Sequence, residues 1–344
     1  MSNGKKTKKK MEFATPKGLR PGSQLDARFP ISYQTSVPEA MRVMVEYFQA
    51  LGQRDMAGVA KSLHFPCALY EDIDPVVIKS KKALLDSPPA SINVTGKGDT
   101  QVMAGSYDLL ERLELQTFCP VSAVLTMSFM RYTPDGHKLV LCDGLYAITN
   151  NDGKWAIELA STIFTPSDYL GIRYPEVENA VFTRSRDWML GYYNRDQAML
   201  NRCRLPGKSA GLRVYGPRER AGNARNNIPM DGYRAEGIKS RIRVTEMTQE
   251  QIDASDANFE QFSGWAGGGI GEWAYSLGLP DVRVLHATVN KAHTMGGYIR
   301  FVGDHVVVSE TRGAGIIVYR DGRWGQAGGP GNMMLHHDRS NSVG

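Results

Sequence analysis

A long internal repeat constrains the fold of this chain more than any other feature of its sequence. Residues 53–57 read Gln-Arg-Asp-Met-Ala, and residues 194–198 read Asn-Arg-Asp-Gln-Ala, 141 positions later. Two further segments, 145–155 and 316–324, each carry an apolar run, an Asp-Gly pair and a tryptophan. Asp-Gly between apolar runs predicts a tight hairpin, because glycine supplies the positive φ that such a turn needs. Repetition over so long a period predicts two tandem domains of one fold.

The helices of each copy can be placed from apolar spacing and capping residues. An amphipathic helix is predicted to begin near residue 40 and to end near Gly52, from four apolar residues on one helical face: Met41, Met44, Phe48 and Leu51. Asp55 and Asp196 are each predicted to cap a second, short helix. A third helix is expected near 107–113 in the first copy and near 272–277 in the second.

The order of elements predicts the fold class. Each copy shows helices first and then several long, antiparallel strands, which is typical of an α+β fold with helices on one face of a bent sheet. We therefore expect two tandem cone-shaped domains, each a curved antiparallel sheet packed against about three helices. The two sheets are expected to pack against each other, as an intrachain counterpart of a dimer, and further homo-oligomerisation stays open.

Domain boundaries follow from the repeat and from charge. We expect a disordered basic leader at 1–30, domain 1 at 31–170, domain 2 at 171–335 and a tail at 336–344. The distance between matching segments grows from 141 to 169 residues, which predicts a longer, Arg-rich insertion in the second copy between Gly216 and Phe262.

Charge and composition exclude several classes of function. The net charge of +5 owes much to five leader lysines, Lys5, Lys6, Lys8, Lys9 and Lys10, so the body is nearly neutral and no nucleic-acid partner is expected. No apolar stretch has the length of a membrane span, and the start of the chain lacks the apolar core of a secretory signal, so we expect a cytoplasmic protein without a membrane partner. Four cysteines without a CxxC pair predict no metal site.

Three segments of the first copy resemble a known family. Residues 47–51 (Tyr-Phe-Gln-Ala-Leu), the Arg-Asp pair at 54–55 and the strand 68–72 (Ala-Leu-Tyr-Glu-Asp) are similar to the opening of ketosteroid isomerase and its SnoaL-like and scytalone dehydratase relatives. The turn at 152–155 resembles the penultimate hairpin of this nuclear transport factor 2-like superfamily. The resemblance covers residues 38–165 well and 178–335 more loosely. It implies a cone fold, which hosts several reactions and also non-catalytic proteins.

The resemblance also implies a catalytic set in the first copy. Ketosteroid isomerase uses a phenol, a carboxylate base and a protonated carboxylic acid. These roles fall on Tyr47, on Glu71 (or on Asp72 if one residue is inserted) and on Asp143. The alternative is that Tyr47 is a core aromatic and that both acids of the pair are solvated at a strand end. An aromatic pocket rim is expected from three tyrosines, Tyr70, Tyr107 and Tyr146.

The second copy departs from this set. Trp188 stands opposite Tyr47, Arg312 stands opposite Asp143, and Gly216 stands opposite Glu71 if Tyr70 is matched to Tyr215. The second copy either supports the first or uses groups of its own, for which the candidates are Tyr192, Tyr215, His286, His293 and Arg312.

These residues predict an enzyme that needs no cofactor. The leading hypothesis is an acid/base lyase, carrying out dehydration, elimination or retro-aldol cleavage of a hydrophobic, aromatic, hydroxylated small molecule. The tandem architecture resembles that of bacterial lyases that remove formaldehyde from lignin-derived diaryl compounds. The alternatives are a ketosteroid-isomerase-like isomerase, an epoxide hydrolase, and a non-catalytic ligand-binding or assembly module.

Overall fold

The computed structural model describes residues 31–89, 105–119, 122–194, 196–215, 239–255, 274–277, 282–302, 306–330 and 333–336. The expected leader, most of the expected tail and much of the expected insertion lie outside these residues. Among the described residues, no helix is both long enough and apolar enough to cross a membrane.

The first copy consists of helices followed mainly by long strands. Its helices are α1 (Ile31–Gly52), α2 (Met56–Lys61), α3 (Lys81–Asp86) and the short 3-10 helix η2 (Ser167–Tyr169). Its strands are β1 (Leu63–Tyr70), β2 (Pro75–Ile78), β3 (Tyr107–Cys119), β4 (Ser122–Tyr132), β5 (Lys138–Asn151) and β6 (Lys154–Pro166).

The second copy repeats this plan with additions. Its helices are α4 (Pro175–Asn194), α5 (Gln197–Cys203) and α6 (Gln249–Asp253). Its strands are β7 (Gly207–Tyr215), β8 (Lys239–Met247), β9 (Ala274–Leu277), β10 (Arg283–Ala287), β11 (Lys291–Val302), β12 (Val306–Arg320), β13 (Arg323–Pro330) and β14 (Met333–His336).

The two sheets share one topology. The first runs β2-β1-β6-β5-β4-β3, and the second runs β8-β7-β13-β12-β11-β10, with β9 and β14 paired onto β11 and β12. Each sheet joins its first and last long strands in parallel, β1 with β6 and β7 with β13. Irregularities in strand pairing recur at the same offset of 169 residues. The register shift after Ala147 in β5 has its counterpart after Ile316 in β12, and the shift after Leu115 in β3 has its counterpart after Val284 in β10. The chain is therefore α+β, with two tandem cones of one fold.

The predicted caps and turns are confirmed. Asp55 accepts a hydrogen bond from the backbone N–H of Ala57 at the start of α2, and Asp196 caps α5 in the same way. Asp152 and Asp321 have φ of 52° and 51°, and the glycine after each is also at positive φ. Both hairpins therefore have the turn that Asp-Gly favours. The first helix ends at Gly52 as predicted but starts at Ile31, earlier than expected.

The predictions for the third helices were wrong. Residues 107–113 open β3, which pairs with β4 from Tyr107 opposite Tyr132 to Cys119 opposite Ser122. Residues 274–277 form β9, and 272–273 lie outside the described residues. The third helix of the first copy is α3, capped by the Ser80 hydroxyl. Cross-strand pairing overrides local apolar spacing in such segments.

The strand register also changes one match between the copies. Ala68 pairs with Leu159, and Ala210 pairs with Gly328. Because Leu159 and Gly328 are equivalent by the 169-residue offset, Ala68 is equivalent to Ala210. Tyr70 therefore corresponds to Leu212, and its match to Tyr215 was wrong.

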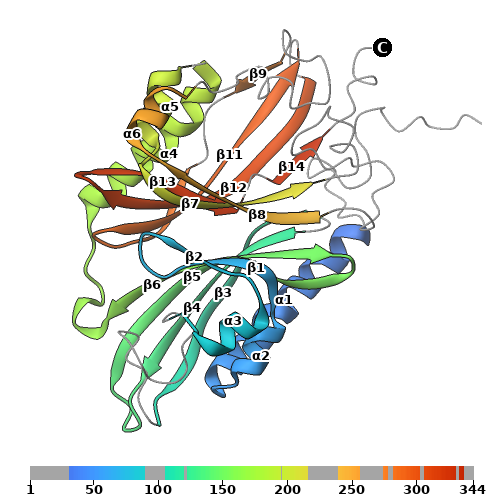
Figure 1. Ribbon diagram of the computed structural model, residues 1–344, viewed down its shortest axis with the longest axis vertical. Helices are drawn as coiled ribbons and strands as arrows, with labels where there is room; N and C mark the ends of the chain where they lie inside the picture. The colour runs from blue at the N-terminus through green and yellow to red at the C-terminus, as the bar shows by residue number, and fades with distance from the viewer. Residues whose placement is uncertain are drawn as a thin grey trace, which may run out of the picture.

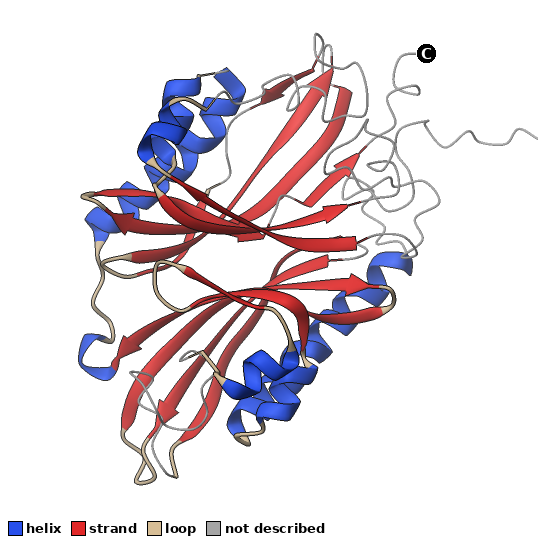
Figure 2. Cartoon of the chain, viewed as in Figure 1, coloured by secondary structure: helices blue, strands red, loops and turns tan. Residues whose placement is uncertain are grey.

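The molecule has four layers, with the two sheets face to face in the middle and helices on the outside (Figure 1, Figure 2). We call the apolar cluster between α1 and the first sheet the inner core; it includes Met44, Tyr47, Cys142 and Tyr146. The cluster between the sheets is the central core; it includes Tyr70, Leu145, Ala147, Met295 and Ile316. On the far side, α4 covers the second sheet through Val181, Ala292, Ile317 and Trp324. Both faces of each sheet are thus buried.

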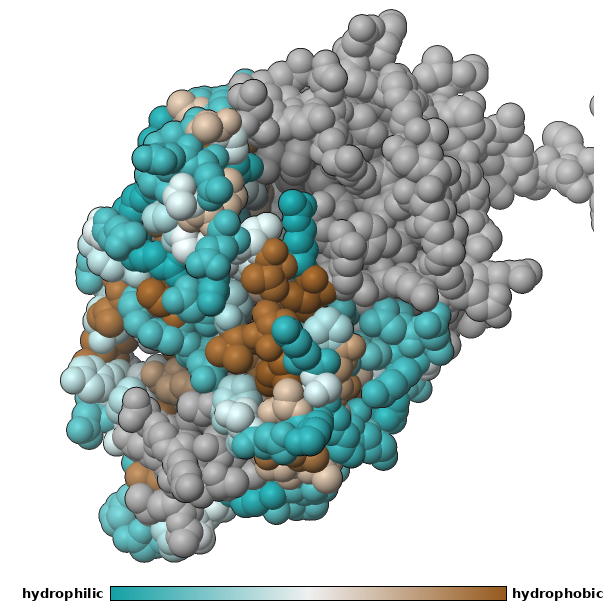
Figure 3. Space-filling view, in the orientation of Figure 1, coloured by the Kyte–Doolittle hydropathy of each residue, from teal (hydrophilic) through white to brown (hydrophobic). Residues whose placement is uncertain are grey.

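One side of the contact between the sheets remains visible at the surface. Figure 3 shows apolar residues gathered in the middle of this face of the molecule. The edge strands β2 and β8 each present a half-exposed valine, Val76 and Val244.

Candidate active site between the two sheets

Tyr47 lies in the inner core. Its side chain is 2% exposed, and its ring packs edge-on against Tyr146 with 5.7 Å between centroids. Burial raises the pKa of the Tyr47 phenol well above its usual value. Tyr47 is thus surrounded by the packed apolar residues between α1 and the first sheet.

Asp143 lies on the other face of the same sheet. Successive side chains of a strand point to opposite faces, and in β5 Cys142 belongs to the inner core while Leu145 belongs to the central core. Asp143 shares the face of Leu145 and contacts His286 of the second copy. The structure therefore does not bring Tyr47 and Asp143 into one funnel, because the sheet separates them.

Glu71 and Asp72 follow β1 and lie against the second copy. The side-chain amide of Asn290 donates to Asp72 at 3.3 Å. The Lys291 ammonium donates to the backbone carbonyls of Tyr70 and Glu71, at 2.9 and 3.3 Å. This strand end thus contacts the turn that precedes β11.

The three tyrosines expected at a pocket rim lie in three different places. Tyr146 is in the inner core and Tyr70 is in the central core. Tyr107 is 40% exposed and stacks on Tyr132, with 5.4 Å between ring centroids. The prediction of a single rim was wrong, because these residues fall on different faces and ends of the sheet.

Among the candidates of the second copy, His293 is fully buried. A second candidate, His286, lies beside Asp143. The remaining three are in described elements, but their side chains lie outside the described part of the structure: Tyr192 in α4, Tyr215 at the end of β7 and Arg312 in β12.

A continuous line of polar side chains crosses the contact between the sheets. Ser128 of β4 donates to Asp143 Oδ1 at 2.6 Å, and His286 Nε2 lies 3.4 Å from the same oxygen. His286 Nδ1 lies 3.3 Å from His293 Nδ1, and His293 Nε2 lies 2.8 Å from the Ser161 hydroxyl. We call these five residues the polar relay. Buried polar groups need such partners, because an unpaired one costs about 1–3 kcal/mol.

His286, the middle member of the polar relay, lines a cavity of about 540 Å³. β3, β10 and α4 contribute to its walls, through Arg112, Glu114, Phe182, Arg283 and His286 among others. His286 keeps 7% of its side chain exposed, and Arg112 Nη2 lies 3.3 Å from its Nε2 atom. A titratable pair at the wall of a cleft between two domains is where a reaction site is expected.

Electrostatics keeps both histidines neutral. Burial lowers the pKa of His286, the Asp143 carboxylate opposes this shift, and Arg112 adds to it. Burial, aided by His286 and Lys291, lowers the pKa of His293 well below its usual value. His286 is therefore an unprotonated imidazole near neutral pH with a carboxylate beside it. Among the described residues, no group of three or more acids, histidines and cysteines could hold a metal ion.

Sequence reasoning named His286 only as one of several candidates and missed Ser128, Ser161 and Arg112. A signal for the histidines did exist, since His286 and His293 flank the short polar segment 288–291 and face each other if it is a turn. No pattern within the first copy indicates that Ser161 faces a histidine of the second, because that contact joins residues 132 positions apart.

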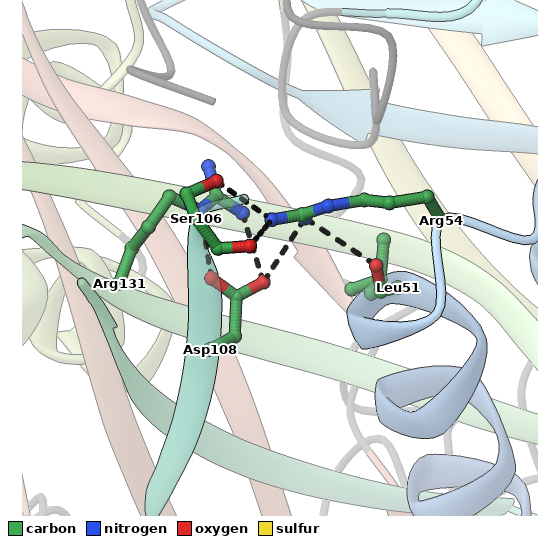
Figure 4. A network of polar contacts seen from close by, with 5 residues as sticks. All are labelled: Leu51, Arg54, Ser106, Asp108 and Arg131. Atoms are coloured by element: carbon green, nitrogen blue, oxygen red, sulfur yellow. Dashed lines mark hydrogen bonds and ion pairs between the residues drawn. The ribbon is translucent and has the colours of Figure 1, made fainter. Parts of the chain in front are cut away.

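A second ionic cluster lies away from the cavity. Asp108 of β3, whose side chain is fully buried, accepts from Arg131 Nε at 2.7 Å and from Arg54 Nη1 at 3.3 Å (Figure 4). Arg54 also donates to the hydroxyl and carbonyl of Ser106 and to the carbonyl of Leu51. This cluster ties the end of α1 to β3 and β4.

No family model and no curated protein matches the sequence. Similar solved structures include a protein of unknown function with a cystatin-like fold from Nostoc punctiforme, at 14% identity over 39% of this chain and 93% of that one, TM-score 0.32. A putative scytalone dehydratase from Novosphingobium aromaticivorans matches at 12% identity over 42% and 99%, TM-score 0.33.

The hexachlorocyclohexane dehydrochlorinase LinA-type3 from Novosphingobium barchaimii matches at 12% identity over 42% of this chain and 97% of its own, TM-score 0.31. The structural neighbours also include an NTF2-like protein and a putative ketosteroid isomerase. These are similarities of fold, and no reaction is carried over from them. The lignin-dimer lyase type stays a prediction.

Proposed function

We propose that this chain is a cofactor-independent acid/base enzyme, a lyase or an isomerase, with its reacting group in the cleft between the two copies. One observation carries the proposal: His286 Nε2 lies 3.4 Å from Asp143 Oδ1 at the wall of a cavity of about 540 Å³. In this proposal Asp143 is not the protonated acid beside Tyr47 that the sequence predicted; it is the carboxylate partner of His286.

The arrangement suits proton abstraction. A neutral imidazole takes a proton from a C–H or O–H group, and the adjacent carboxylate stabilises the imidazolium that forms. Arg112, beside His286 Nε2, supplies positive charge to the oxyanion that develops on the substrate. In an elimination the leaving group then departs with the electron pair of its bond, and in an isomerisation His286 returns the proton to another atom.

The cavity wall supports an aromatic, ionised substrate. Phe182 presents a ring that is 39% exposed, and Arg112 and Arg283 supply guanidinium groups for a phenolate or a carboxylate. The substrate class we propose is therefore a hydroxylated aromatic molecule with an acidic group.

The test is turnover of a panel of hydroxybenzoates and hydroxycinnamates, followed by proton NMR with the wild type, His286→Gln and Tyr47→Phe. We expect a product with the wild type and a loss of about 100-fold or more in rate with His286→Gln. If Tyr47→Phe abolished turnover while His286→Gln retained it, the reaction would belong to the first cone. Binding of a panel member by both the wild type and His286→Gln, with no turnover by either, would identify a binding module.

A further inference from the structure

We propose that His293 and Ser161 are positioning residues that hold His286 in the tautomer with its hydrogen on Nδ1, so that Nε2 faces the cleft with an unshared electron pair. The inference rests on the proposed function, because it explains how His286 is ready to take a proton. Neither residue touches the cavity, so their effect is exerted through His286.

The contact between the two histidines couples their tautomers. Their Nδ1 atoms are 3.3 Å apart, and both rings are neutral because burial lowers the pKa of each. A hydrogen bond at this contact needs one hydrogen, on one of the two Nδ1 atoms. If His286 carries it, His293 carries its own hydrogen on Nε2; if His293 carries it, His286 has its hydrogen on Nε2. The two rings therefore adopt opposite tautomers.

The partners at each end select one of these arrangements. Arg112 Nη2 is 3.3 Å from His286 Nε2 and can only donate, so this nitrogen must accept. Asp143 Oδ1 is slightly farther from Nε2, at 3.4 Å, and already receives the Ser128 hydroxyl. At the other end, the Ser161 hydroxyl is 2.8 Å from His293 Nε2 and can accept its hydrogen. His286 thus carries its hydrogen on Nδ1.

This tautomer makes proton uptake possible without a change of tautomer, and the Arg112 hydrogen bond to Nε2 is released when the proton binds. The incoming proton binds Nε2 of His286, which then donates to Asp143 Oδ1, while the Nδ1–H bond to His293 is unchanged. In the opposite tautomer Nε2 would already carry hydrogen, and the only unshared pair would face His293. The charged groups that bias His286 are Arg112 and Glu114 of β3 and Asp143 of β5, and Lys291 of β11 acts on His293.

The test is nitrogen-15 NMR of the imidazole rings in the full chain without substrate, where protonated and unprotonated ring nitrogens are resolved. Assignment uses His286→Gln and His293→Gln spectra. At pH 8 we expect His286 to carry hydrogen on Nδ1 and His293 on Nε2. Ser161→Ala removes the hydroxyl and leaves the buried Nε2–H of His293 without an acceptor. In the opposite arrangement the same change leaves only an unprotonated nitrogen without a donor, and buried N–H groups without a partner are the rarer case, so we expect the balance to shift toward the opposite pair of tautomers.

Ser209→Ala in β7, whose hydroxyl bonds to Thr245, is the matched control and should leave both rings unchanged. A wild-type spectrum with hydrogen on Nε2 of His286, or a Ser161→Ala spectrum equal to the wild type, would overturn the inference. The NMR experiment contains no substrate, so it can be interpreted whether or not the proposed reaction is found. Turnover without the expected tautomers would contradict only the positioning role. The expected tautomers without turnover would contradict only the proposed function.

Discussion

The Tyr70 phenol of the first copy donates a hydrogen bond to the carbonyl of Ala327 in the second copy, at 2.7 Å. It also contacts Ala210, from whose backbone N–H it accepts a hydrogen bond. With its side chain 1% exposed, Tyr70 joins the two sheets through polar contacts inside an apolar core.

Replacing Tyr70 by Phe should therefore destabilise the fold. The change leaves buried backbone groups of Ala210 and Ala327 without their partner, at a cost of about 1–3 kcal/mol in the free energy of unfolding, measured by urea denaturation. Tyr107→Phe is the control; that side chain is 40% exposed, and we expect a change within about 0.5 kcal/mol. Equal effects of the two substitutions would contradict a polar connection between the sheets.

Lys291 should make stability depend on pH. Burial lowers its pKa to about 7, from 10.5 in the unfolded chain. Between these values the unfolded chain binds more protons than the folded one, so the free energy of unfolding rises with pH. Relative to Lys291→Met, the wild type should gain stability from pH 7 to pH 9 in urea titrations. Lys82→Met, at an exposed lysine, should show no such difference, and a constant gap between wild type and Lys291→Met would refute the assignment.

The Asp108 cluster should be critical for the first copy. Asp108→Asn removes the negative charge between two guanidinium groups, one of which, in Arg131, is 5% exposed. We expect a loss of about 3 kcal/mol or more, seen as a lower urea midpoint. Asp86→Asn breaks the exposed ion pair with Lys82 and should cost less than about 1 kcal/mol. A similar small loss in both variants would show that the Asp108 charge does not stabilise the fold.

Asp143→Asn tests the charge beside His286. The carboxylate raises the pKa of His286 against the effect of burial, so its removal should lower that pKa further, in an NMR titration of the ring. The local structure around residue 143 should be retained, because the asparagine side chain keeps an oxygen that accepts from the Ser128 hydroxyl. Asp135→Asn, at an exposed acid, is the control and should leave the pKa of His286 unchanged; an equal change of the His286 pKa in both variants would contradict the prediction.

The sequence alone determined the duplicated α+β fold, because the features that encode it are local. The N-caps Asp55 and Asp196, the apolar face of α1 and the Asp-Gly turns at 152–153 and 321–322 each act within a few residues, through side-chain acceptors and backbone dihedral preferences. Residues 107–113 are the exception: a helix was predicted there from the apolar spacing, but these residues pair with β4 and form a strand.

Only the tertiary structure decided where the polar groups meet. The sequence identified Asp143 and His293 as candidates but placed Asp143 inside the first cone with Tyr47. Because a strand in a sheet buried on both sides points alternate residues into two different cores, a shift of one residue decides which core receives a carboxylate. The contact of Asp143 with His286 joins residues 143 positions apart in two copies of the fold, and it exists only because the two sheets pack face to face.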